Sequence, residues 1–213
     1  MIDIYKFTFN PFGENTYLLV DPDTKEAAVV DPGMHTKAER DFFDRKVDEL
    51  GANITQVINT HLHLDHCFGI NYVKNKYGIP LKANTADSSL GKSLDMQSER
   101  FHIPADTTPL SIDINLRDGD EITVGESLIR VIHTPGHTPG GISLYLPENG
   151  VLISGDTLFQ GSVGRTDLGG NHAQLISAIR QKLLTLPPST KVLPGHGPAT
   201  TCLLYTSPSP RDS

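Results

Sequence analysis

Apolar and polar residues alternate over short stretches near the start of the chain. Alternation with a period of two is typical of strands that bury one face, and Gly, Pro and Asn between such stretches indicate turns. Residues of this turn-forming kind occupy positions 10–13 and 31–33. The pattern therefore predicts a meander of three strands at residues 2–9, 16–20 and 27–30.

Farther along, apolar residues recur at helical spacing in several segments. In the first of these, Phe42, Phe43, Val47 and Leu50 precede Gly51, and glycine commonly ends a helix. A helix with one apolar face packs that face against another element, here a sheet. The pattern predicts helices at residues 36–50, 67–77, 85–99 and 173–184.

Short apolar runs bounded by turn residues lie between the predicted helices. They predict strands at residues 54–59, 122–124, 127–132, 142–146, 151–154 and 191–193. Strands and helices in this mixture favour an α/β fold in which helices cover the faces of sheets. No internal repeat or long linker divides the chain, so we expect a single domain at residues 1–201.

The composition limits the possible partners. Hydrophobic residues make up 37% and charged residues 20% of the chain, which is ordinary for a soluble globular protein. A formal net charge of -7 provides no basic surface for phosphates, which argues against nucleic acid and favours a small-molecule substrate. No stretch is apolar enough to cross a membrane, and the first residues lack a signal-peptide pattern. We therefore expect a cytoplasmic protein without a membrane partner.

The end of the chain has a different character. The run CLLYTSPSPRD at residues 202–212 resembles the translation of a sequencing-library adapter. Residues 202–213 are therefore predicted to be a non-native tail, with the native end after about Thr201 missing; a natural Ser- and Pro-rich tail is the alternative. Without that tail, Cys67 has no cysteine to pair with in the chain, which fits a reducing compartment.

Four residues with metal-binding side chains follow the predicted strand at 54–59: His61, His63, Asp65 and His66. Residues two apart on an extended segment point the same way, so His61 and His63 can bind one cation together. Asp65 and His66, where the chain turns into a helix, can reach a second cation. Imidazole and carboxylate ligands suit zinc, iron or manganese. A solvated polar loop is the alternative, which this density of ligand residues disfavours.

Three further residues of this kind follow apolar runs. His137 lies in HTPGHTPGG, Asp156 ends VLISGD, and His196 lies in LPGHGP. The prolines and glycines predict tight turns directly after strands. Each residue alone is ambiguous, but together they predict one cluster at a common edge of the sheets.

The order HxHxDH, then H, D and H, resembles the ligand pattern of the metallo-β-lactamase superfamily, over about residues 5–198. The resemblance implies a four-layer αββα sandwich, with two mixed sheets and helices on both outer faces. It also implies two divalent metal ions, zinc first, with iron or manganese as alternatives. In the family's pattern, His61, His63 and His137 would bind one ion, Asp65, His66 and His196 the second, and Asp156 both.

Within the superfamily, the chain is most similar to short glyoxalase II-like hydrolases, through NTYLLVD, VVDPG, THLHLDH, TPGHTPGG, SGDTLFQGSVGRTDLGG and LPGHGP. That similarity implies hydrolysis of a thioester, such as S-lactoylglutathione or a related S-hydroxyacyl thiol, with Asp65 and Asp156 as catalytic residues. Two ions bridged by a carboxylate can share a hydroxide, which is a nucleophile at neutral pH. A thiolate also leaves without a strong general acid.

Residues around the ligands are candidates for supporting roles. Arg165, on a glycine-rich segment, is a candidate for substrate contact, and a solvated charge is the alternative. True glyoxalase II enzymes have Lys and Tyr where this chain has Arg165 and Thr166, and they carry a further helical domain, so glutathione specificity stays open. Asp31 is expected to shape a turn, with support of a ligand as the alternative. Cys67 is expected to be buried and not catalytic.

Three other functions stay open. A persulfide dioxygenase shares the HxHxDH and GRTD patterns but uses one iron, which His61, His137 and Asp156 would hold here. A β-lactamase is disfavoured, because one subclass has Arg and Cys where this chain has His66 and Asp156. An inactive metal-binding scaffold is disfavoured by the complete set of ligands.

Overall fold

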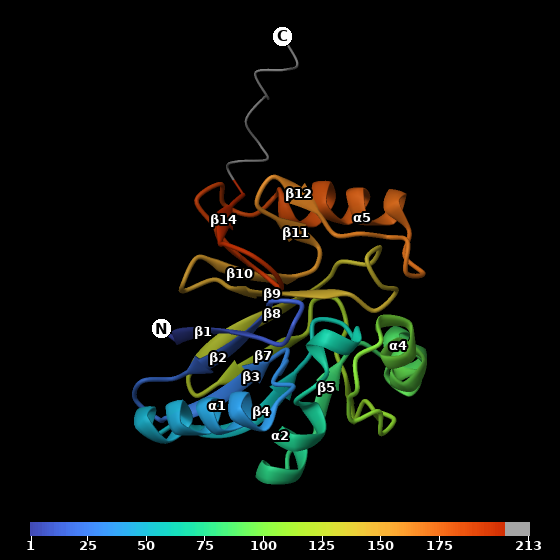
Figure 1. The fold of residues 1–213 in the computed structure, drawn as a ribbon. Helices are drawn as coiled ribbons and strands as arrows, with labels where there is room; N and C mark the ends of the chain where they lie inside the picture. The colour runs from blue at the N-terminus through green and yellow to red at the C-terminus, as the bar shows by residue number, and fades with distance from the viewer. Residues whose placement is uncertain (203–213) are drawn as a thin grey trace.

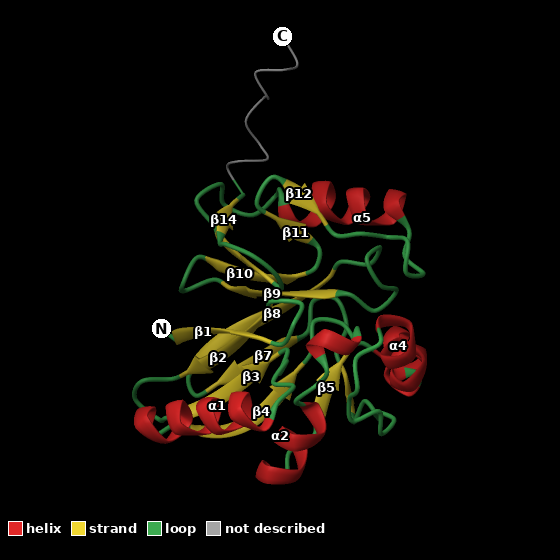
Figure 2. Cartoon of the chain, viewed as in Figure 1, coloured by secondary structure: helices red, strands yellow, loops and turns green. Residues whose placement is uncertain are grey.

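Two β-sheets packed face to face form the centre of the molecule, and helices lie on their outer sides (Figure 1 and Figure 2). The structure is a computed structural model and describes residues 1–202. Most of the predicted non-native tail, residues 203–213, lies outside the described residues. Cys202, where that tail begins, is buried, and its N–H donates to the Thr190 carbonyl.

The first sheet has the strand order β1-β2-β3-β4-β5-β6. β1, β2 and β3 pair antiparallel, which confirms the predicted meander, whereas β3 to β6 pair parallel. Parallel neighbours need crossover connections, and helices supply them here. The bounds are β1 Asp3–Phe9, β2 Glu14–Val20, β3 Glu26–Val30, β4 Asn53–Ile58, β5 Leu81–Ala83 and β6 Ile114–Asn115.

The second sheet has the strand order β14-β13-β10-β9-β8-β7. It is also mixed, because β10 and β13 pair parallel while the other neighbours pair antiparallel. Its bounds are β7 Glu121–Val124, β8 Ser127–His133, β9 Ile142–Leu146, β10 Val151–Gly155, β13 Lys191–Pro194 and β14 Thr200–Thr201. A small hairpin of β11 (Leu158–Phe159) and β12 (Ser162–Val163) follows β10.

Helices cover the outer faces of both sheets. α1 (Lys37–Leu50) and α2 (Ile70–Tyr77) pack on the first sheet, and α5 (His172–Ala178), continued by the π-helical turn η3 (Ile179–Leu183), packs on the second. The layers run helix, sheet, sheet, helix, which confirms the predicted αββα sandwich. The remaining helical segments are η1 Leu64–His66, η2 Thr85–Asp87, α3 Ser88–Lys92 and α4 Leu94–Phe101. Among residues 1–202, no helix is long and apolar enough to cross a membrane.

Strand β2 shows how one segment contributes to two layers of core. Leu18 and Val20 belong to the cluster beneath α1 and α2, whereas Tyr17 and Leu19 belong to the cluster between the sheets. All four side chains are buried, as expected for a strand with both faces covered. Burying a large apolar side chain contributes about 1.5–3 kcal/mol. The layer between the sheets therefore fixes the position of one sheet against the other.

Helix α1 has sequence signals at both ends. The Thr36 hydroxyl accepts a hydrogen bond from the Glu39 N–H, and the Glu39 side chain accepts one from the Thr36 N–H, which makes a capping box. Gly51 follows the last turn with a φ of 61°, a left-handed conformation that glycine adopts without strain. The helix predicted at residues 36–50 is therefore confirmed, and these signals explain where it begins and ends.

Two of the predicted helices differ from the structure. The single helix predicted at residues 85–99 is wrong, because the segment forms η2, α3 and α4 and breaks at Ser93. There the Ser93 hydroxyl and the Gln97 amide both donate to the Leu90 carbonyl, and such side-chain bonds compete with a continuous helix. The helix predicted to begin at Cys67 begins at Ile70, because the 3-10 turn η1 precedes it.

Phe43 provides a test of how α1 packs. Its side chain is buried, and its ring centroid lies 5.4 Å from that of Phe7 in β1. Phe43→Ala should lower the free energy of unfolding by about 3–5 kcal/mol, because a cavity remains. Phe42→Ala is the matched control: this ring is 41% exposed, and we expect a loss of about 1 kcal/mol. Urea denaturation measures both, and equal losses would contradict this packing.

Candidate metal site

Strands of both sheets end at the same side of the molecule, and the predicted ligands follow these ends. The first sheet contributes the segment after β4, and the second contributes the segments after β8, β10 and β13. Residues far apart in the sequence meet there because the two sheets pack face to face. The structure brings together all seven predicted ligands, which are His61, His63, Asp65, His66, His137, Asp156 and His196.

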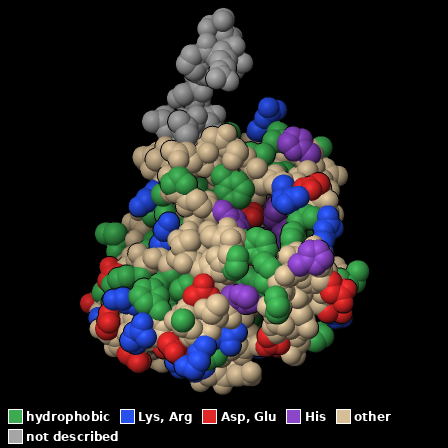
Figure 3. Space-filling view, viewed as in Figure 1, with side chains coloured by type: hydrophobic (Ala, Val, Ile, Leu, Met, Phe, Trp, Pro, Cys, Tyr) green, Lys and Arg blue, Asp and Glu red, His purple; other side chains and the backbone are tan. Residues whose placement is uncertain are grey.

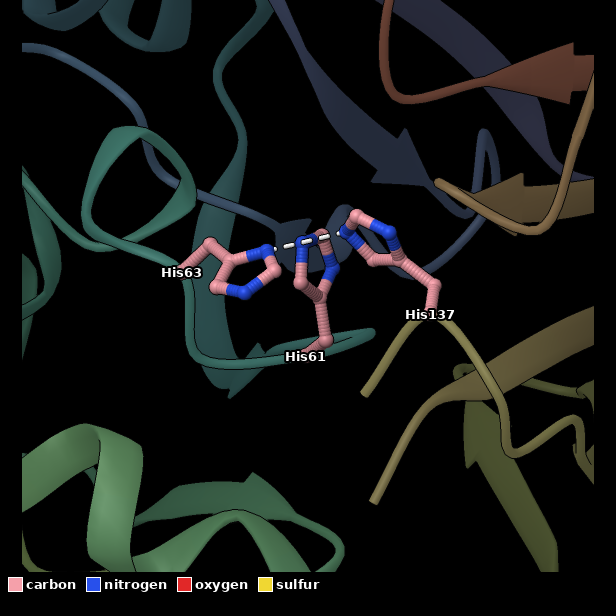
Figure 4. A group of neighbouring side chains, drawn as sticks. All are labelled: His61, His63 and His137. Atoms are coloured by element: carbon pink, nitrogen blue, oxygen red, sulfur yellow. Dashed lines mark hydrogen bonds between the residues drawn. The ribbon is translucent and has the colours of Figure 1, made fainter. Parts of the chain in front are cut away.

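Three imidazoles form the first group of candidate ligands (Figure 4). The Nδ1 of His63 lies 2.9 Å from the Nε2 of His137. The ring centroid of His61 lies 4.9 Å from that of His63 and 4.8 Å from that of His137. All three side chains are buried. Three neutral imidazoles in this arrangement can bind one cation.

Asp65, His66 and His196 form the second group. The Nε2 of His196 lies 3.0 Å from Asp65 Oδ2 and 3.3 Å from His66 Nε2. Asp65 Oδ2 lies 3.7 Å from the same nitrogen of His66. His66 is buried, whereas Asp65 and His196 are partly exposed. This group therefore opens toward solvent more than the three-histidine group does.

Asp156 lies between the two groups. Its Oδ1 is 3.5 Å from His66 Nε2, and its Oδ2 is 3.5 Å from His137 Nε2 and 3.6 Å from His196 Nε2. One carboxylate oxygen thus faces the second group, while the other faces a histidine of each group. A carboxylate so placed can bridge two cations.

The surroundings of two buried imidazoles, His61 and His63, favour their neutral form. Burial lowers the pKa of His61, and the neighbouring His66 and His137 lower it further. Burial likewise lowers the pKa of His63 to about 3, with a further contribution from His137. A neutral imidazole is the form that binds a metal ion. His61 and His63 therefore need to lose no proton when a cation binds.

The carboxyl groups of Asp65 and Asp156 have lowered pKa values, whereas the pKa of His66 is raised. Burial alone would raise the pKa of Asp65 and Asp156, but His66, His196 and the other nearby histidines together outweigh burial and hold both pKa values below their usual range. Burial alone would lower the pKa of His66, but these two carboxylates and that of Asp31 together outweigh burial and raise the pKa. A cation bound here would give these carboxylates a partner of opposite charge.

Several polar atoms of the cluster lack a partner among the described residues. His61 Nε2, His63 Nε2 and Asp156 Oδ1 are buried and make no hydrogen bond. A buried polar atom without a partner costs about 1–3 kcal/mol. A cation would satisfy His61 Nε2 and Asp156 Oδ1, which lie where the ligands converge. The residues present therefore fit a metal ion.

A cavity of about 560 Å³ opens above the cluster. Figure 3 shows histidine and acidic side chains in a hollow on this face, with hydrophobic side chains around it. Phe12 and Phe101 pack edge to face in its wall, with ring centroids 5.5 Å apart. Phe159, Leu168 and Arg165 also line the cavity. The cavity can admit a small molecule to the candidate ligands.

A family model shows which proteins share this combination of fold and site. The model described as the metallo-beta-lactamase superfamily matches residues 9–196, which include all seven candidate ligands. The chain belongs to the metallo-β-lactamase superfamily. The match extends from the end of β1 to His196, so it covers strands β2 to β13 and the helices between them.

Two curated bacterial members of the superfamily are similar along most of their length. A protein of Bacillus subtilis strain 168, described as probable metallo-hydrolase YqgX, is 37% identical over 209 residues, covering 94% of this chain and 92% of its own. Hydroxyacylglutathione hydrolase GloC of Haemophilus influenzae is 36% identical over 198 residues, covering 89% of this chain and 88% of its own.

Two solved structures of the superfamily superpose on this fold. The structure described as BLEG-1 B3 metallo-beta-lactamase gives a TM-score of 0.87 at 34% identity, covering 98% of this chain and 99% of that one. The structure of TTHA1623, described as a di-iron-bound form, gives a TM-score of 0.84 at 31% identity, covering 97% of this chain and 99% of that one. The fold implied by the ligand pattern is thereby confirmed.

In this member of the superfamily, four of the candidate ligand histidines are held through their second ring nitrogen. The partners of these Nδ1 atoms are Thr60 Oγ1 for His61 (3.0 Å), Asp31 Oδ2 for His66 (3.1 Å), the Arg165 carbonyl for His137 (2.7 Å) and the Phe12 carbonyl for His196 (3.2 Å). A hydrogen bond at one ring nitrogen fixes the tautomer and the orientation of the other. The four rings are therefore oriented before any cation binds.

Asp31 supports the site as well as shaping the turn that its sequence predicts. It has a φ of 51° at the end of β3. Its Oδ1 accepts the Thr60 N–H at 2.7 Å, and its Oδ2 accepts the Thr60 hydroxyl at 2.6 Å as well as facing His66. Because Thr60 occupies both oxygens, we assign Asp31 to orienting His66 and not to binding a cation.

The Arg165 side chain lies at the edge of the cavity. Its Nε and one terminal nitrogen donate to the two carboxylate oxygens of Asp167, at 2.7 and 2.5 Å. The side chain is 56% exposed, so it is free to contact a substrate. Its backbone carbonyl, which holds His137, was not a predicted contact, because main-chain atoms give no signal in a sequence.

Gly195 allows the end of β13 to approach the ligands. A Cβ atom at this position would lie 2.2 Å from Asp156 Oδ1 and 2.7 Å from His66 Cε1. Any larger residue would have to displace one of these side chains. The glycine before His196 in LPGHGP is therefore required by the site, not only by the turn.

Gly195→Ala should weaken the binding of a divalent metal on the order of 10-fold or more, because ligand orientation is lost. Gly197→Ala is the matched control. Its φ of 74° strains an alanine, but a Cβ there would meet nothing within 4 Å, so we expect a stability loss of about 1–2 kcal/mol and unchanged affinity. Equilibrium dialysis with zinc measures the binding, and equal affinities of the two variants would contradict the prediction.

Proposed function

We propose that the chain is a hydrolase that uses two divalent metal ions to cleave thioesters. The observation that carries this proposal is the position of Asp156, whose oxygens face His66 on one side and His137 and His196 on the other. Superfamily membership and the relative described as a metallo-hydrolase support a metal-dependent hydrolase. The di-iron form of TTHA1623 supports the presence of two ions.

The ligands divide as the two groups suggest. We assign His61, His63 and His137 to one ion, Asp65, His66 and His196 to the other, and Asp156 to both. Zinc is the first choice for such nitrogen-rich sites, and iron or manganese are the alternatives. When bound, two such ions would supply a Lewis acid for a carbonyl oxygen and would lower the pKa of a water molecule to about 7.

We assign proton transfer to Asp65. It lines the cavity, and its side chain is 17% exposed. Its lowered pKa, caused by His66 and His196 against the effect of burial, keeps the carboxylate ionised, so that it can accept a proton from an attacking water. The 3.0 Å contact with His196 Nε2 holds the carboxylate in place. Asp156, which is buried more deeply, is assigned to holding the two groups together.

A thioester of a small thiol suits this cavity. A thiolate is a good leaving group, so the reaction needs no strong general acid beside it. The relative described as a hydroxyacylglutathione hydrolase supports an S-hydroxyacyl thiol such as S-lactoylglutathione. The cavity volume of about 560 Å³ is typical of sites for small molecules. We also propose a cytoplasmic location, supported by the unpaired, buried thiol of Cys67.

Metal analysis followed by a substrate screen tests this function. We expect two metal equivalents per chain and turnover of S-lactoylglutathione or another S-hydroxyacyl thiol, because two groups of ligands share Asp156. A chelator should abolish turnover, and zinc should restore it. One iron per chain with oxygen uptake on a persulfide would instead identify a dioxygenase. Turnover of a lactam in place of thioesters would identify a β-lactamase, the description that the BLEG-1 structure carries.

Asp65→Asn tests whether the site catalyses a reaction or only binds metal. In metal-loaded protein, the variant should lower kcat on the order of 10² to 10⁴-fold, the usual contribution of a general base or acid. Asp106→Asn is the matched control, because Asp106 lies outside the cavity lining. Full activity of Asp65→Asn would contradict its assignment.

Arg165→Ala tests whether the guanidinium contacts the substrate. We expect KM to rise about 10-fold with kcat nearly unchanged, because a contact present equally in the bound substrate and the transition state affects binding alone. The backbone carbonyl that holds His137 remains, so the metal content should stay at the wild-type value. Steady-state kinetics and metal analysis measure both, and an unchanged KM would identify Arg165 as a solvated charge.

A further inference from the structure

A buried carboxylate outside the predicted site joins the two loops that carry the three-histidine group. Asp87, the last residue of η2, is 1% exposed. Its Oδ2 accepts the Leu62 N–H at 3.2 Å and the Thr138 hydroxyl at 2.8 Å, and its Oδ1 accepts the Gly140 N–H at 2.6 Å. All three donors are buried as well. Burying a carboxylate is costly unless such bonds satisfy it.

The three donors lie next to the histidines. Leu62 lies between His61 and His63, and Thr138 directly follows His137. The first loop follows β4 of the first sheet, and the second lies between β8 and β9 of the second sheet. A backbone bond from Ile142 to Thr60 also joins these segments, at 2.8 Å. Asp87 thus extends a connection between the sheets up to the residues that flank the ligands.

Asp87 has no part in capping the helix that follows it. It occupies the position before α3, where an aspartate commonly accepts hydrogen bonds from the first turn, but its side chain makes no capping bond. The carboxylate instead turns toward the 134–141 segment. A Cβ on Gly140 would lie 2.7 Å from both Asp87 Cγ and Asp87 Oδ1, so the glycine of TPGG leaves the space that this carboxylate occupies.

We propose that Asp87 is a positioning residue that sets the separation between His137 and the pair His61 and His63. The proposal rests on the proposed function only in that these three histidines bind a metal ion. An ionised carboxylate can accept all three bonds at once, whereas an asparagine has a single acceptor oxygen and faces one N–H with its own NH₂. Without the full set of bonds, the two loops are no longer held at the spacing that one ion requires.

Asp87→Asn should therefore weaken the ion at the three-histidine group by about 10- to 100-fold, the usual effect of losing a partner behind a metal ligand. The ion at Asp65, His66 and His196 should be retained, because Asp87 makes no hydrogen bond to any of these three residues. Wild-type protein in buffered zinc should contain two equivalents, and Asp87→Asn about one. Anomalous diffraction of zinc-loaded crystals identifies which ion remains.

Asp21→Asn is the matched control. Asp21 is also buried, at 3% exposed, and also accepts three N–H bonds, from Asp23, Thr24 and Glu126. It too joins the first sheet to the second, but at the opposite end of β2 from Glu14, whose backbone pairs with His196. We expect Asp21→Asn to lower the Tm while keeping both zinc equivalents. This contrast separates a general loss of stability from loss of one ion.

Several outcomes would overturn the proposal. One is that Asp87→Asn binds two zinc equivalents with wild-type affinity. Another is that Asp21→Asn loses one zinc ion selectively, as expected of Asp87→Asn. If Asp87→Asn does not fold, Thr138→Val removes a single bond and should weaken the same ion by several-fold; unchanged affinity would then overturn the proposal. Wild-type protein that binds no zinc would overturn this proposal together with the proposed function. Absence of thioester turnover in protein with two equivalents would overturn the substrate assignment alone.

Discussion

Buried imidazoles and carboxylates, gathered where two packed sheets end, are the constraint on which the rest of the structure depends. Burial penalises charge and so lowers the pKa of His61 and His63, whereas at Asp65 and Asp156 the nearby histidines together outweigh that penalty and lower the pKa of both carboxyl groups. A cluster of this kind is stable only where hydrogen bonds fix its members and opposite charges face each other. The segments after β4, β8, β10 and β13 therefore have little freedom to move independently.

The contact between the sheets supplies part of that rigidity. The Tyr17 hydroxyl in β2 donates to the Pro194 carbonyl at 2.6 Å, and the Asn15 amide donates to the carbonyls of Pro194 and Gly197. These bonds run from the first sheet to the segment that carries His196. The apolar layer between the sheets and these polar bonds act together, because a shift of one sheet against the other would move the ligands of one sheet away from those of the other.

The resemblance to the metallo-β-lactamase superfamily implied the αββα sandwich, whereas the individual elements and the candidate ligands could be predicted from the residues for two physical reasons. Long strands and helices such as β2 and α1 carry a periodic apolar pattern, and few residue types bind metals, so His61 and His63 are conspicuous beside each other. The thiol of Cys67 was also expected to be inert, and burial does raise its pKa. Strands of two or three residues, such as β5, β6 and β14, are too short to show a period.

What could not be predicted depends on contacts between segments distant in the sequence. Asp31 lies 35 positions from His66, and a side chain alone does not reveal that its oxygens face an imidazole. The Arg165 carbonyl that holds His137 is a main-chain atom, which every residue has. These groups become visible only after the sheets have packed. Sequence patterns thus identify the atoms that bind a cation more readily than the atoms that hold those ligands in place.

Glu14 shows how the fold controls negative charge near the cluster. This residue of β2 is fully buried, and burial raises the pKa of its carboxyl group, so a negative charge is costly at this position. Its Oε2 accepts the Thr16 hydroxyl at 2.9 Å and lies where a Cβ on Gly33 would be. Burial thus works against a further negative charge at Glu14, beside the cluster. The carboxylate oxygens that do face the imidazoles belong to Asp65 and Asp156, and they lie where the two groups of candidate ligands meet.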